Sequence, residues 1–571
     1  MIRDLITKEI SDVLGNLVRG VEFSVERTEN SAHGDYASNA ALVAAKVLKK
    51  NPQALAEELV SRLSEDLPKG VEKAEVAGPG FINFSLKREY FSNTVHEIIS
   101  QGEKYGRNEN LKKKKVMVEY TDPNPFKEFH IGHLMSNAIG ETIARLFEAQ
   151  GAEVKRACYQ GDVGLHVAKA IWGMQSVPHR DEKPLDKLSP EGKAHYLGHA
   201  YQLGAAAYED QSKDEIETLN KKIYDRSDTE VNKLYDWGRK VSLEYFEQIY
   251  KRLGTKFDFF FFESDAAEDG KKVVEKGLKE EVFEKSDGAI VFRAEKHDSK
   301  LHTRVFVNSQ GLPTYEAKEL GLAKMKSDTY TYDKSIVITG NEVNDYFRVL
   351  LQAMKLVYPE LAEKTQHLSH GMLRLPSGKM SSRTGDVITG ESLIGQVGSM
   401  VEEKIKERDY DEKLQREIVE VVSVGAIKYS ILRQAIGGDI VFDFDRSISF
   451  EGDSGPYLQY TATRAQSVLL KGKEEGLKPE TKKASETVVP FERLLSFFPE
   501  VVERAGRENA PHLLVTYLTE LAGAFNHFYA HETIVEQNDP YSPYKLALTK
   551  AFRVVMENGL WILGIKVPER M

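Results

Sequence analysis

The chain has 571 residues, more than one hydrophobic core usually supports, so we expect three or four domains. Its formal net charge is −10 and its pI is about 5.9, so contact with nucleic acid would depend on local basic groups rather than on an overall field. The single cysteine, Cys158, excludes disulfides within the chain and thiolate zinc clusters. The charged N-terminus and the lack of any run of about 18 apolar residues predict a cytoplasmic protein with no membrane partner.

Residues 1–108 are expected to form a small α+β domain. Apolar residues recur at helical spacing at its start, and its end reads VAGPGFINFSL, where a Gly-Pro-Gly turn precedes a strand over 81–86. Four lysines, 112–115, then lead into VMVEY, which predicts the first buried strand of a new domain. We expect these lysines to be exposed to solvent immediately before that strand.

Residues 109–395 alternate strand-like runs with amphipathic helical stretches, the pattern of a Rossmann-like α/β domain with a parallel sheet. The strand-like runs are VMVEY, EVKRACY, FDFFFF and SIVITG. Within this domain, a charged segment over about 174–290 predicts a helical and connective insertion. Four consecutive phenylalanines, 259–262, predict a strand that is buried on both faces.

After residue 395 strand signals nearly vanish, and apolar residues recur at helical spacing to the end of the chain. We expect a helical linker over 396–450 and an all-α helical bundle over 451–571.

A short stretch, NPFKEFHIGHL over 124–134, holds two histidines between the strand ending at Tyr120 and a helical stretch. In parallel α/β folds ligands bind at such strand-to-helix switches, where free N–H groups favour an anion. Gly132, between His130 and His133, lets a flat group approach the backbone. Phosphate is therefore the favoured ligand. A metal site would need a third ligand, and a purely structural pair of histidines is the other alternative.

A second stretch, LRLPSGKMSSRTGDVITG over 373–390, is a basic loop rich in Gly and Ser. Together with the His-Ile-Gly-His turn, it resembles the paired signatures of class I aminoacyl-tRNA synthetases. The resemblance implies an ATP site with Mg²⁺ brought by ATP and no dedicated metal site. The residues it implies for ATP are His130, Gly132, His133, Lys379, Ser381, Ser382 and Arg383.

Further stretches narrow the resemblance. VEYTDPNPFKEFHIGHLMSNAIGE, YQGDVGLH, PTYEAKEL, SGPYLQYTATRA, TYLTELAGAFNHFYAH and LGIKVPERM occur in the same order as in arginyl-tRNA synthetases, and GDYASNAAL and GPGFINF are similar to the extra N-terminal domain of that family. The resemblance implies ATP-dependent attachment of L-arginine to tRNA(Arg) through an arginyl-adenylate, with release of pyrophosphate and AMP. It also implies a D-loop contact by residues 1–108, a stem contact by 396–450 and anticodon binding by 451–571. We expect a monomer.

Arginine suits an anionic pocket because its guanidinium is a planar fork of donors that pairs with carboxylates. The family positions that bind arginine match Glu119, Asp122, Asn124, His130, Tyr315, Glu319 and Asn341. The positions that touch tRNA match Phe81, Asn83, Tyr457, Tyr460, Arg464 and Met571.

The sequence departs from the family pattern at four positions. Glu319 stands where Asp is usual, Asp122 where Ser is common, His166 where Gln is common, and Ser382 where the mobile loop usually has a second lysine. In family members whose loop lacks this lysine, a lysine just before the histidine turn supplies the missing charge, and Lys127 stands at that position. The resemblance therefore implies that Lys127 shares the catalytic work on the phosphates with His130, His133 and Lys379.

Two alternative functions follow from the same residues. One is a class I synthetase of another specificity, although Glu119 and Glu319 favour a cationic substrate and a single cysteine argues against a cysteinyl enzyme. The other is an inactive tRNA-binding paralogue, which the retained histidine turn and Lys379 argue against.

Overall fold

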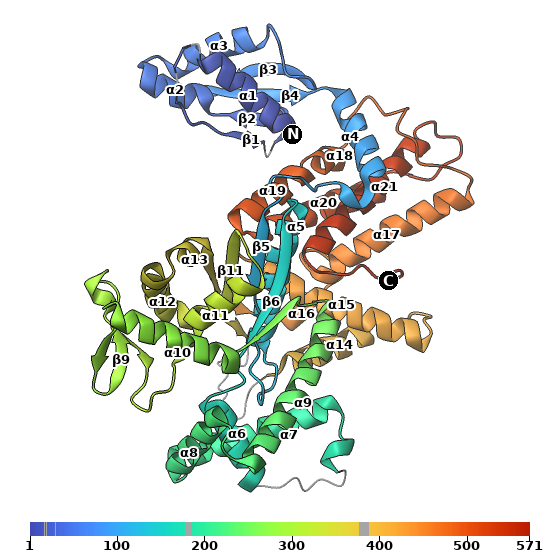
Figure 1. Cartoon of the computed structure of the whole chain (residues 1–571). Coiled ribbons are helices and arrows are strands. Elements are labelled where there is room, and N and C mark those ends of the chain that lie inside the picture. Colours follow the sequence, from blue (N-terminus) through green and yellow to red (C-terminus); the bar gives the residue numbers. More distant parts are fainter. Residues whose placement is uncertain (16, 19, 29, 177–183, 376–387) are drawn as a thin grey trace. The chain divides into compact units, whose positions relative to one another are not determined.

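The computed structural model describes residues 1–15, 17–18, 20–28, 30–176, 184–375 and 388–571 (Figure 1). The chain divides into two compact units. Unit 1 comprises Met1–Gly106, Arg464–Val501 and Glu520–Asn558, and unit 2 comprises Arg107–Thr463, Val502–Thr519 and Gly559–Met571. Among the described residues, no helix has both the length and the apolar character needed to cross a membrane.

Unit 1 begins with an α+β fold, as the sequence predicts. An antiparallel sheet has the order β1 (Val25–Arg27), β2 (Tyr36–Ser38), β4 (Phe81–Leu86) and β3 (Val71–Ala77). Helices α1 (Ile2–Gly15), α2 (Ala40–Leu48) and α3 (Pro52–Leu63) pack on it, and α4 (Arg88–Gln101) follows. Short 3₁₀ helices are η1 (Ser31–His33) and η2 (Gly102–Lys104). The predicted strand over 81–86 is confirmed.

The C-terminal part of the chain is helical, as expected. Its helices are α17 (Gly455–Glu474), α18 (Pro490–Ser496), α19 (Phe498–Glu508), α20 (Pro511–His531) and α21 (Ser542–Ile562). Within unit 1 the ring of Phe525 stacks on that of Phe552, with centroids 3.9 Å apart. Arg88 of α4 pairs with the buried Glu492 of α18 at 2.8 Å, which joins the N-terminal fold to α18 within unit 1.

Unit 2 is built on a five-stranded parallel sheet, which confirms the predicted Rossmann-like fold (Figure 1). The strand order is β12 (Thr365–His370), β11 (Lys334–Gly340), β5 (Lys115–Glu119), β6 (Glu153–Gln160) and β7 (Phe259–Phe262). β5 is central, so its carboxyl end lies between those of β11 and β6. β7 is an edge strand with Phe260 41% exposed, so the prediction of a strand buried on both faces was wrong.

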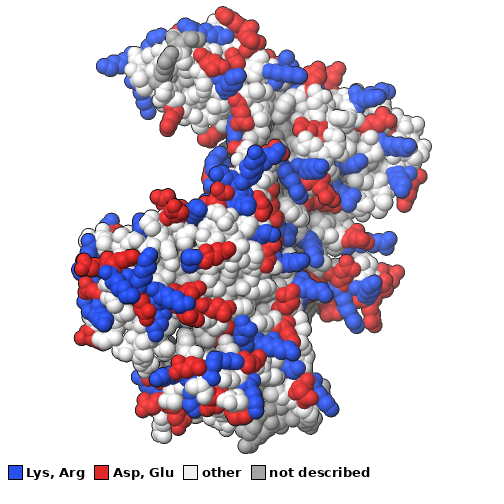
Figure 2. Space-filling view, viewed as in Figure 1, with Lys and Arg blue, Asp and Glu red and all other residues white. Residues whose placement is uncertain are grey.

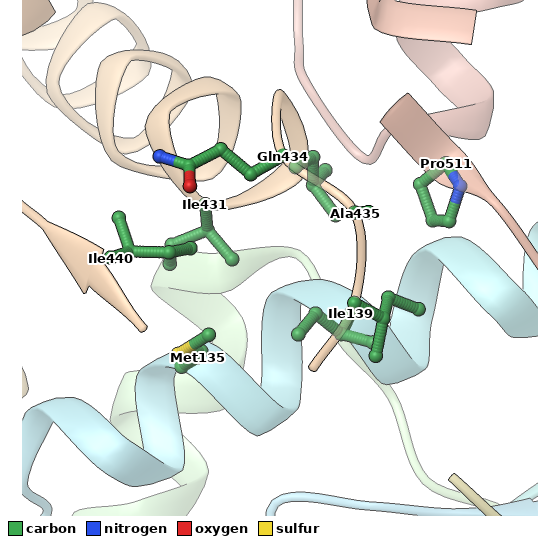
Figure 3. A pocket seen from close by; sticks show the side chains of 9 residues that line it. Met135, Ile139, Ile431, Gln434, Ala435, Ile440 and Pro511 are labelled. Atoms are coloured by element: carbon green, nitrogen blue, oxygen red, sulfur yellow. The ribbon is translucent and has the colours of Figure 1, made fainter. Parts of the chain in front are cut away.

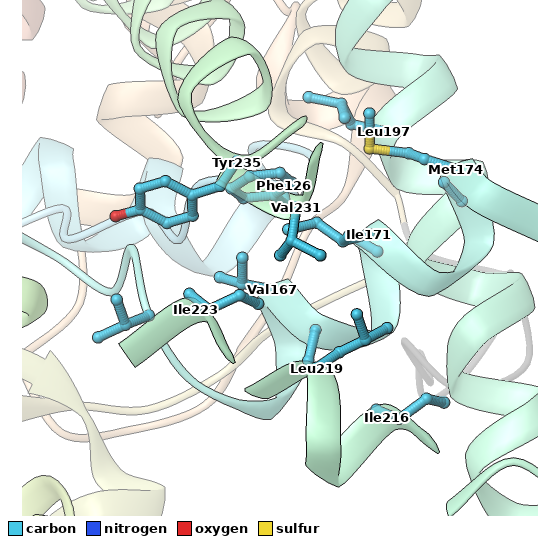
Figure 4. Packing of buried hydrophobic residues seen from close by; sticks show 14 of the residues in the cluster. Phe126, Val167, Ile171, Met174, Leu197, Ile216, Leu219, Ile223, Val231 and Tyr235 are labelled. Atoms are coloured by element: carbon cyan, nitrogen blue, oxygen red, sulfur yellow. The ribbon is translucent and has the colours of Figure 1, made fainter. Parts of the chain in front are cut away.

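Helices α6 (Leu165–Ser176), α7 (Pro190–Asp210), α8 (Lys213–Asp225) and α9 (Thr229–Leu253), with the 3₁₀ helix η3 (Leu185–Lys187), lie between β6 and β7. They surround their own hydrophobic core (Figure 4). The chain then returns to the main sheet at β7, inside the range expected for the insertion. Helix α10 (Glu263–Lys279) and a three-stranded antiparallel sheet of β8 (Glu284–Ser286), β9 (Ala289–Phe292) and β10 (Arg304–Val307) follow.

Helix α5 (Ile131–Ala149) crosses from β5 to β6, and one of its faces meets α15 (Glu412–Leu432). Met135 and Ile139 of α5 lie against Ile431 and the turn that follows α15 (Figure 3). The remaining elements of unit 2 are η4 (Ala294–Lys296), α11 (Tyr315–Thr329), η5 (Asn341–Val343), α12 (Asn344–Val357), α13 (Pro359–Lys364), β13 (Leu373–Arg374), α14 (Gly390–Ile405), β14 (Ile440–Val441) and α16 (Phe444–Ser447).

Acidic and basic side chains are intermixed on the face of the molecule seen in Figure 2. This distribution fits the net charge of −10, and it means that any nucleic-acid contact on this face depends on particular side chains rather than on a uniformly basic surface.

Candidate active site

The histidine turn lies at the start of α5, directly beyond the carboxyl end of β5. His130 caps the helix: its Nδ1 accepts from the Gly132 N–H at 3.1 Å, and the His133 Nδ1 accepts from the His130 N–H at 3.2 Å. The two rings stack with centroids 3.6 Å apart. The predicted strand-to-helix switch is therefore present, and the helix begins at Ile131, before the second histidine.

Both histidines are neutral near pH 7. Burial, followed by the charge of Lys127, lowers the pKa of His130 to about 4, and burial also lowers the pKa of His133. Because each Nδ1 accepts a backbone hydrogen bond, the ring proton of each histidine is on Nε2. The turn therefore offers two neutral imidazole donors beside the helix N-terminus. Within the described ranges, no group of three or more His, Cys, Asp or Glu side chains is arranged to hold a metal ion.

The loop before the turn is anchored by the inserted helices. Phe126 is fully buried and points into their hydrophobic core (Figure 4). Its N–H donates to Ser242 Oγ at 2.9 Å, and a Cβ at Gly238 would lie 2.2 Å from its ring. The backbone is left-handed at Phe126, with a φ of 67°, and also at Asp122, with a φ of 46°. Packing therefore fixes an otherwise unfavourable loop conformation next to the turn.

Lys127 follows this anchor. Its Nζ lies 4.7 Å from the centre of the Tyr201 ring on α7. Burial, followed by the charge of Lys169, lowers the pKa of Lys127 to about 8, so the side chain is still mainly cationic at pH 7.

An acidic group gathers at the carboxyl end of β5. Glu119 ends the strand and is 1% exposed, Asp122 follows it, and Glu319 projects from α11. Burial and then the charge of Glu119 raise the pKa of Asp122 well above its usual range and that of Glu319 to about 8. Asp122 Oδ1 accepts from the Tyr159 N–H at 2.7 Å. These carboxylates repel one another, so a cation placed among them would be strongly favoured.

Two residues that sequence reasoning missed contact this acidic group. Lys326 Nζ lies 2.8 Å from Glu119 Oε2, in an ion pair rather than an aligned hydrogen bond, and Tyr346 donates to Glu319 Oε1 at 3.3 Å. The spacing of Glu319 and Lys326, seven residues apart on one helix, could have placed Lys326 on the same face of α11.

Asn124 lies beside Gly161, which follows β6. A Cβ at Gly161 would lie 2.3 Å from Asn124 Oδ1 and 3.1 Å from Glu263 Oε1, so only glycine leaves room for both side chains. Glu263 pairs with the buried Lys318 at 2.7 Å, a second pair that the sequence did not reveal. The Nε2 of His166 is 2.7 Å from the Gly161 carbonyl, and burial lowers the pKa of His166 to about 3, so it is a neutral donor there.

Tyr315 begins α11 and is 60% exposed, on the same helix as Glu319. Asn341 directly follows β11, the neighbour of β5, and so lies at the same edge of the sheet. The predicted residues of the mobile loop, Lys379, Ser381, Ser382 and Arg383, lie outside the described residues.

The predicted tRNA contacts of the N-terminal domain line a cavity of about 510 Å³. Phe81 opens β4 and is 40% exposed, whereas Asn83, on the same strand, is 6% exposed. The other lining residues include Thr28, Asn30 and His33. An exposed aromatic ring beside amide and hydroxyl groups suits a single unstacked base.

The other predicted tRNA contacts lie on α17 and at the C-terminus. The Tyr460 ring meets that of Phe450 edge-on at 6.2 Å. Arg464 donates to Asn526 Oδ1 at 2.6 Å within unit 1. The segment before Met571 lies against the start of α17 within unit 2, where Gln459 donates to the Lys566 carbonyl at 2.7 Å.

Comparisons with known proteins agree with this architecture. The model of the family described as tRNA synthetases class I (R), catalytic domain, matches residues 94–444. The chain belongs to the arginyl-tRNA synthetase family. The family's N-terminal domain matches residues 1–86, and the DALR anticodon binding domain matches residues 458–571.

Relatives in this family match over the whole chain. The arginine–tRNA ligase of Thermococcus sibiricus is 31% identical over 100% of this chain and 99% of its own length, and that of Borrelia hermsii is 29% identical over 100% and 99%. The arginyl-tRNA synthetase structure of Thermus thermophilus aligns with a TM-score of 0.82 at 26% identity, covering 100% of both chains.

Proposed function

We propose that the chain attaches L-arginine to tRNA(Arg) at the site between β5, the histidine turn and α11. The observation that carries this assignment is the acidic group of Glu119, Asp122 and Glu319 next to a helix N-terminus capped by neutral histidines. The acidic group suits a guanidinium and the helix N-terminus suits a phosphate, so one site can bind both arginine and the phosphates of ATP. Membership of the arginyl-tRNA synthetase family supports the same assignment.

In the first step, a carboxylate oxygen of arginine attacks the α-phosphorus of ATP, and the bond to the bridging oxygen breaks to release pyrophosphate. Glu119 and Glu319 hold the guanidinium, Tyr315 and Asn341 complete the pocket, and Asn124 Oδ1 accepts from the α-ammonium. The Asp122 carboxyl, which follows Glu119 at the end of β5, shares in binding the cation. The enzyme's work is positioning and neutralisation of charge, and no covalent enzyme intermediate is needed.

His130 and His133 donate their Nε2–H groups to phosphate oxygens, while Gly132 gives the nucleotide access to the helix start. Lys127 adds a cation and shares this task with Lys379. Ser381, Ser382 and Arg383 of the same loop complete the ATP contacts, and Mg²⁺ arrives with ATP.

In the second step, a hydroxyl of the terminal tRNA ribose attacks the arginyl carbonyl and AMP leaves. The cavity of Phe81 and Asn83 supports contact with a tRNA loop base. Tyr457, Tyr460, Arg464 and Met571 support contact with the anticodon. The chain works as a cytoplasmic monomer. Its domains comprise residues 1–108, 109–395, 396–450 and 451–571.

ATP–pyrophosphate exchange with each of the 20 amino acids, with and without tRNA(Arg), tests the assignment. The resemblance to arginyl-tRNA synthetases implies that amino-acid activation needs bound tRNA, so we expect exchange only with arginine and only when the tRNA is present. Exchange with a different amino acid would point to another class I specificity, and no exchange under any condition would favour an inactive tRNA-binding paralogue.

A further inference from the structure

We propose that Lys326 is a positioning residue that sets arginine specificity: it holds Oε2 of Glu119 and thereby reserves the other carboxylate oxygens of the pocket for the substrate guanidinium. This inference rests on the proposed function and deepens it. Lys326 does not need to touch arginine, because it acts through Glu119.

Among the described residues, Glu119 is the carboxylate that forms an ion pair with Lys326. The side chains of Lys326 and Glu119 are 4% and 1% exposed, and Nζ lies 2.8 Å from Oε2. Burial acts to lower the pKa of Lys326, but the Glu119 carboxylate outweighs it and the pKa is raised, so the lysine stays cationic. One oxygen of Glu119 is therefore committed to a permanent internal cation.

The same cation acts on the rest of the acidic group. The charge of Lys326 works to lower the pKa of both Asp122 and Glu319, against burial and the charge of Glu119. Without Lys326, these two carboxyls would hold their protons up to a higher pH, and a protonated carboxyl pairs poorly with a guanidinium. Lys326 thus lowers the pH above which these carboxyls are ionised and can pair with the guanidinium of arginine.

Other ionisable groups surround the acidic group without replacing this cation. Tyr346 of α12 donates to Glu319. Tyr159 of β6 and Tyr332 before β11 have buried hydroxyls that lack a hydrogen-bond partner among the described residues, and Glu263 of α10 adds a further negative charge. These groups are neutral or negative near pH 7, so they do not offset the repulsion among the carboxylates.

A lysine suits this role because an ammonium is a compact point charge, whereas arginine requires a planar fork of acceptors. Lys326 can therefore neutralise one oxygen without occupying the plane that the substrate needs. The opposite possibility is that Lys326 competes with arginine for Glu119. The two roles predict opposite changes in affinity when the lysine is removed.

The test compares Lys326→Met with wild type by tRNA-dependent pyrophosphate exchange from about pH 6.5 to about pH 9. We expect the KM for arginine to rise by about tenfold or more at pH 7, with kcat within about threefold and the KM for ATP unchanged. Because the pocket carboxyls of the variant would lose their protons at higher pH, its KM should recover as the pH rises, and the midpoint of this dependence should lie above that of wild type.

Two further variants and one control keep the test decisive. Lys326→Arg retains the cation and should restore the KM for arginine to within about threefold of wild type. Lys326→Gln is neutral and similar in size, and it replaces the Met variant if that variant does not fold. Lys324→Met removes a lysine from the same helix whose side chain is 44% exposed, and it should leave the KM for arginine unchanged.

An unchanged or lowered KM for arginine in the neutral variants would overturn the proposal, as would a pH midpoint identical to that of wild type. A failure of the proposed function looks different, because wild type itself would then show no exchange with arginine.

Discussion

The Gly161→Ala variant is expected to bind arginine more weakly while remaining folded. Its new Cβ would lie 2.3 Å from Asn124 Oδ1, where ordinary contact begins at 3.4 Å, so the amide must retreat by about 1 Å. The amide is the far end of a flexible side chain, and Gly161 has no positive φ, so we expect the free energy of unfolding to change by less than about 1 kcal/mol. A misplacement of about 1 Å at a reacting site can cost up to about 100-fold.

The assay is tRNA-dependent pyrophosphate exchange with varied arginine, paired with thermal unfolding. We expect the KM for arginine to rise by about 10-fold to about 100-fold, which corresponds to about 1.4 to about 2.7 kcal/mol. The matched control is Gly395→Ala on α14, where, apart from the adjoining backbone of the helix itself, no atom of the described residues lies within 4 Å of the new methyl group. The control should keep its KM and gain stability slightly, because alanine favours helix more than glycine does. A KM for Gly161→Ala within about twofold of wild type would refute the role of Asn124.

Three further results are expected. Lys127→Ala should slow arginyl-adenylate formation by about 30-fold, or about 2 kcal/mol, because a cation is lost at the phosphates. In wild type the contribution of Lys127 to the rate should fade as the pH rises through about 8, where the lysine loses its charge. A rate for Lys127→Ala within about twofold of wild type in single-turnover measurements would contradict this role. Phe126→Ala should reduce the free energy of unfolding of unit 2 by about 3 to about 5 kcal/mol in denaturant titrations, with Phe126→Leu losing much less, because the ring fills the core of the inserted helices. Phe81→Ala should raise the KM for tRNA by about tenfold with Phe81→Tyr near wild type, and an unchanged KM would remove the N-terminal cavity from tRNA binding.

Local sequence determined the parts of the fold that depend on neighbouring residues. The turn after β5, the helix start at the histidines and the alternation of strand and helix all follow from Pro and Asn placement, capping and periodicity. The order of signature stretches was enough to indicate the family. The carboxylates Glu119 and Glu319 were also named from the sequence, because they match the positions that bind arginine in the family that the sequence resembles.

Tertiary structure alone decided which strand lies at the edge of the sheet and which charged side chains form ion pairs. On the edge strand β7, Phe260 is 41% exposed whereas Phe261, on the opposite face of the sheet, is 5% exposed. Which face of a strand is covered depends on the elements packed against it and not on the strand's own residues. Lys326 meets Glu119 only because α11 packs beside the end of β5, and Gly161 leaves room for Asn124 only because β6 ends next to the loop. Ion pairing and steric room depend on distances in space between residues far apart in the chain, so they follow from packing and not from local pattern.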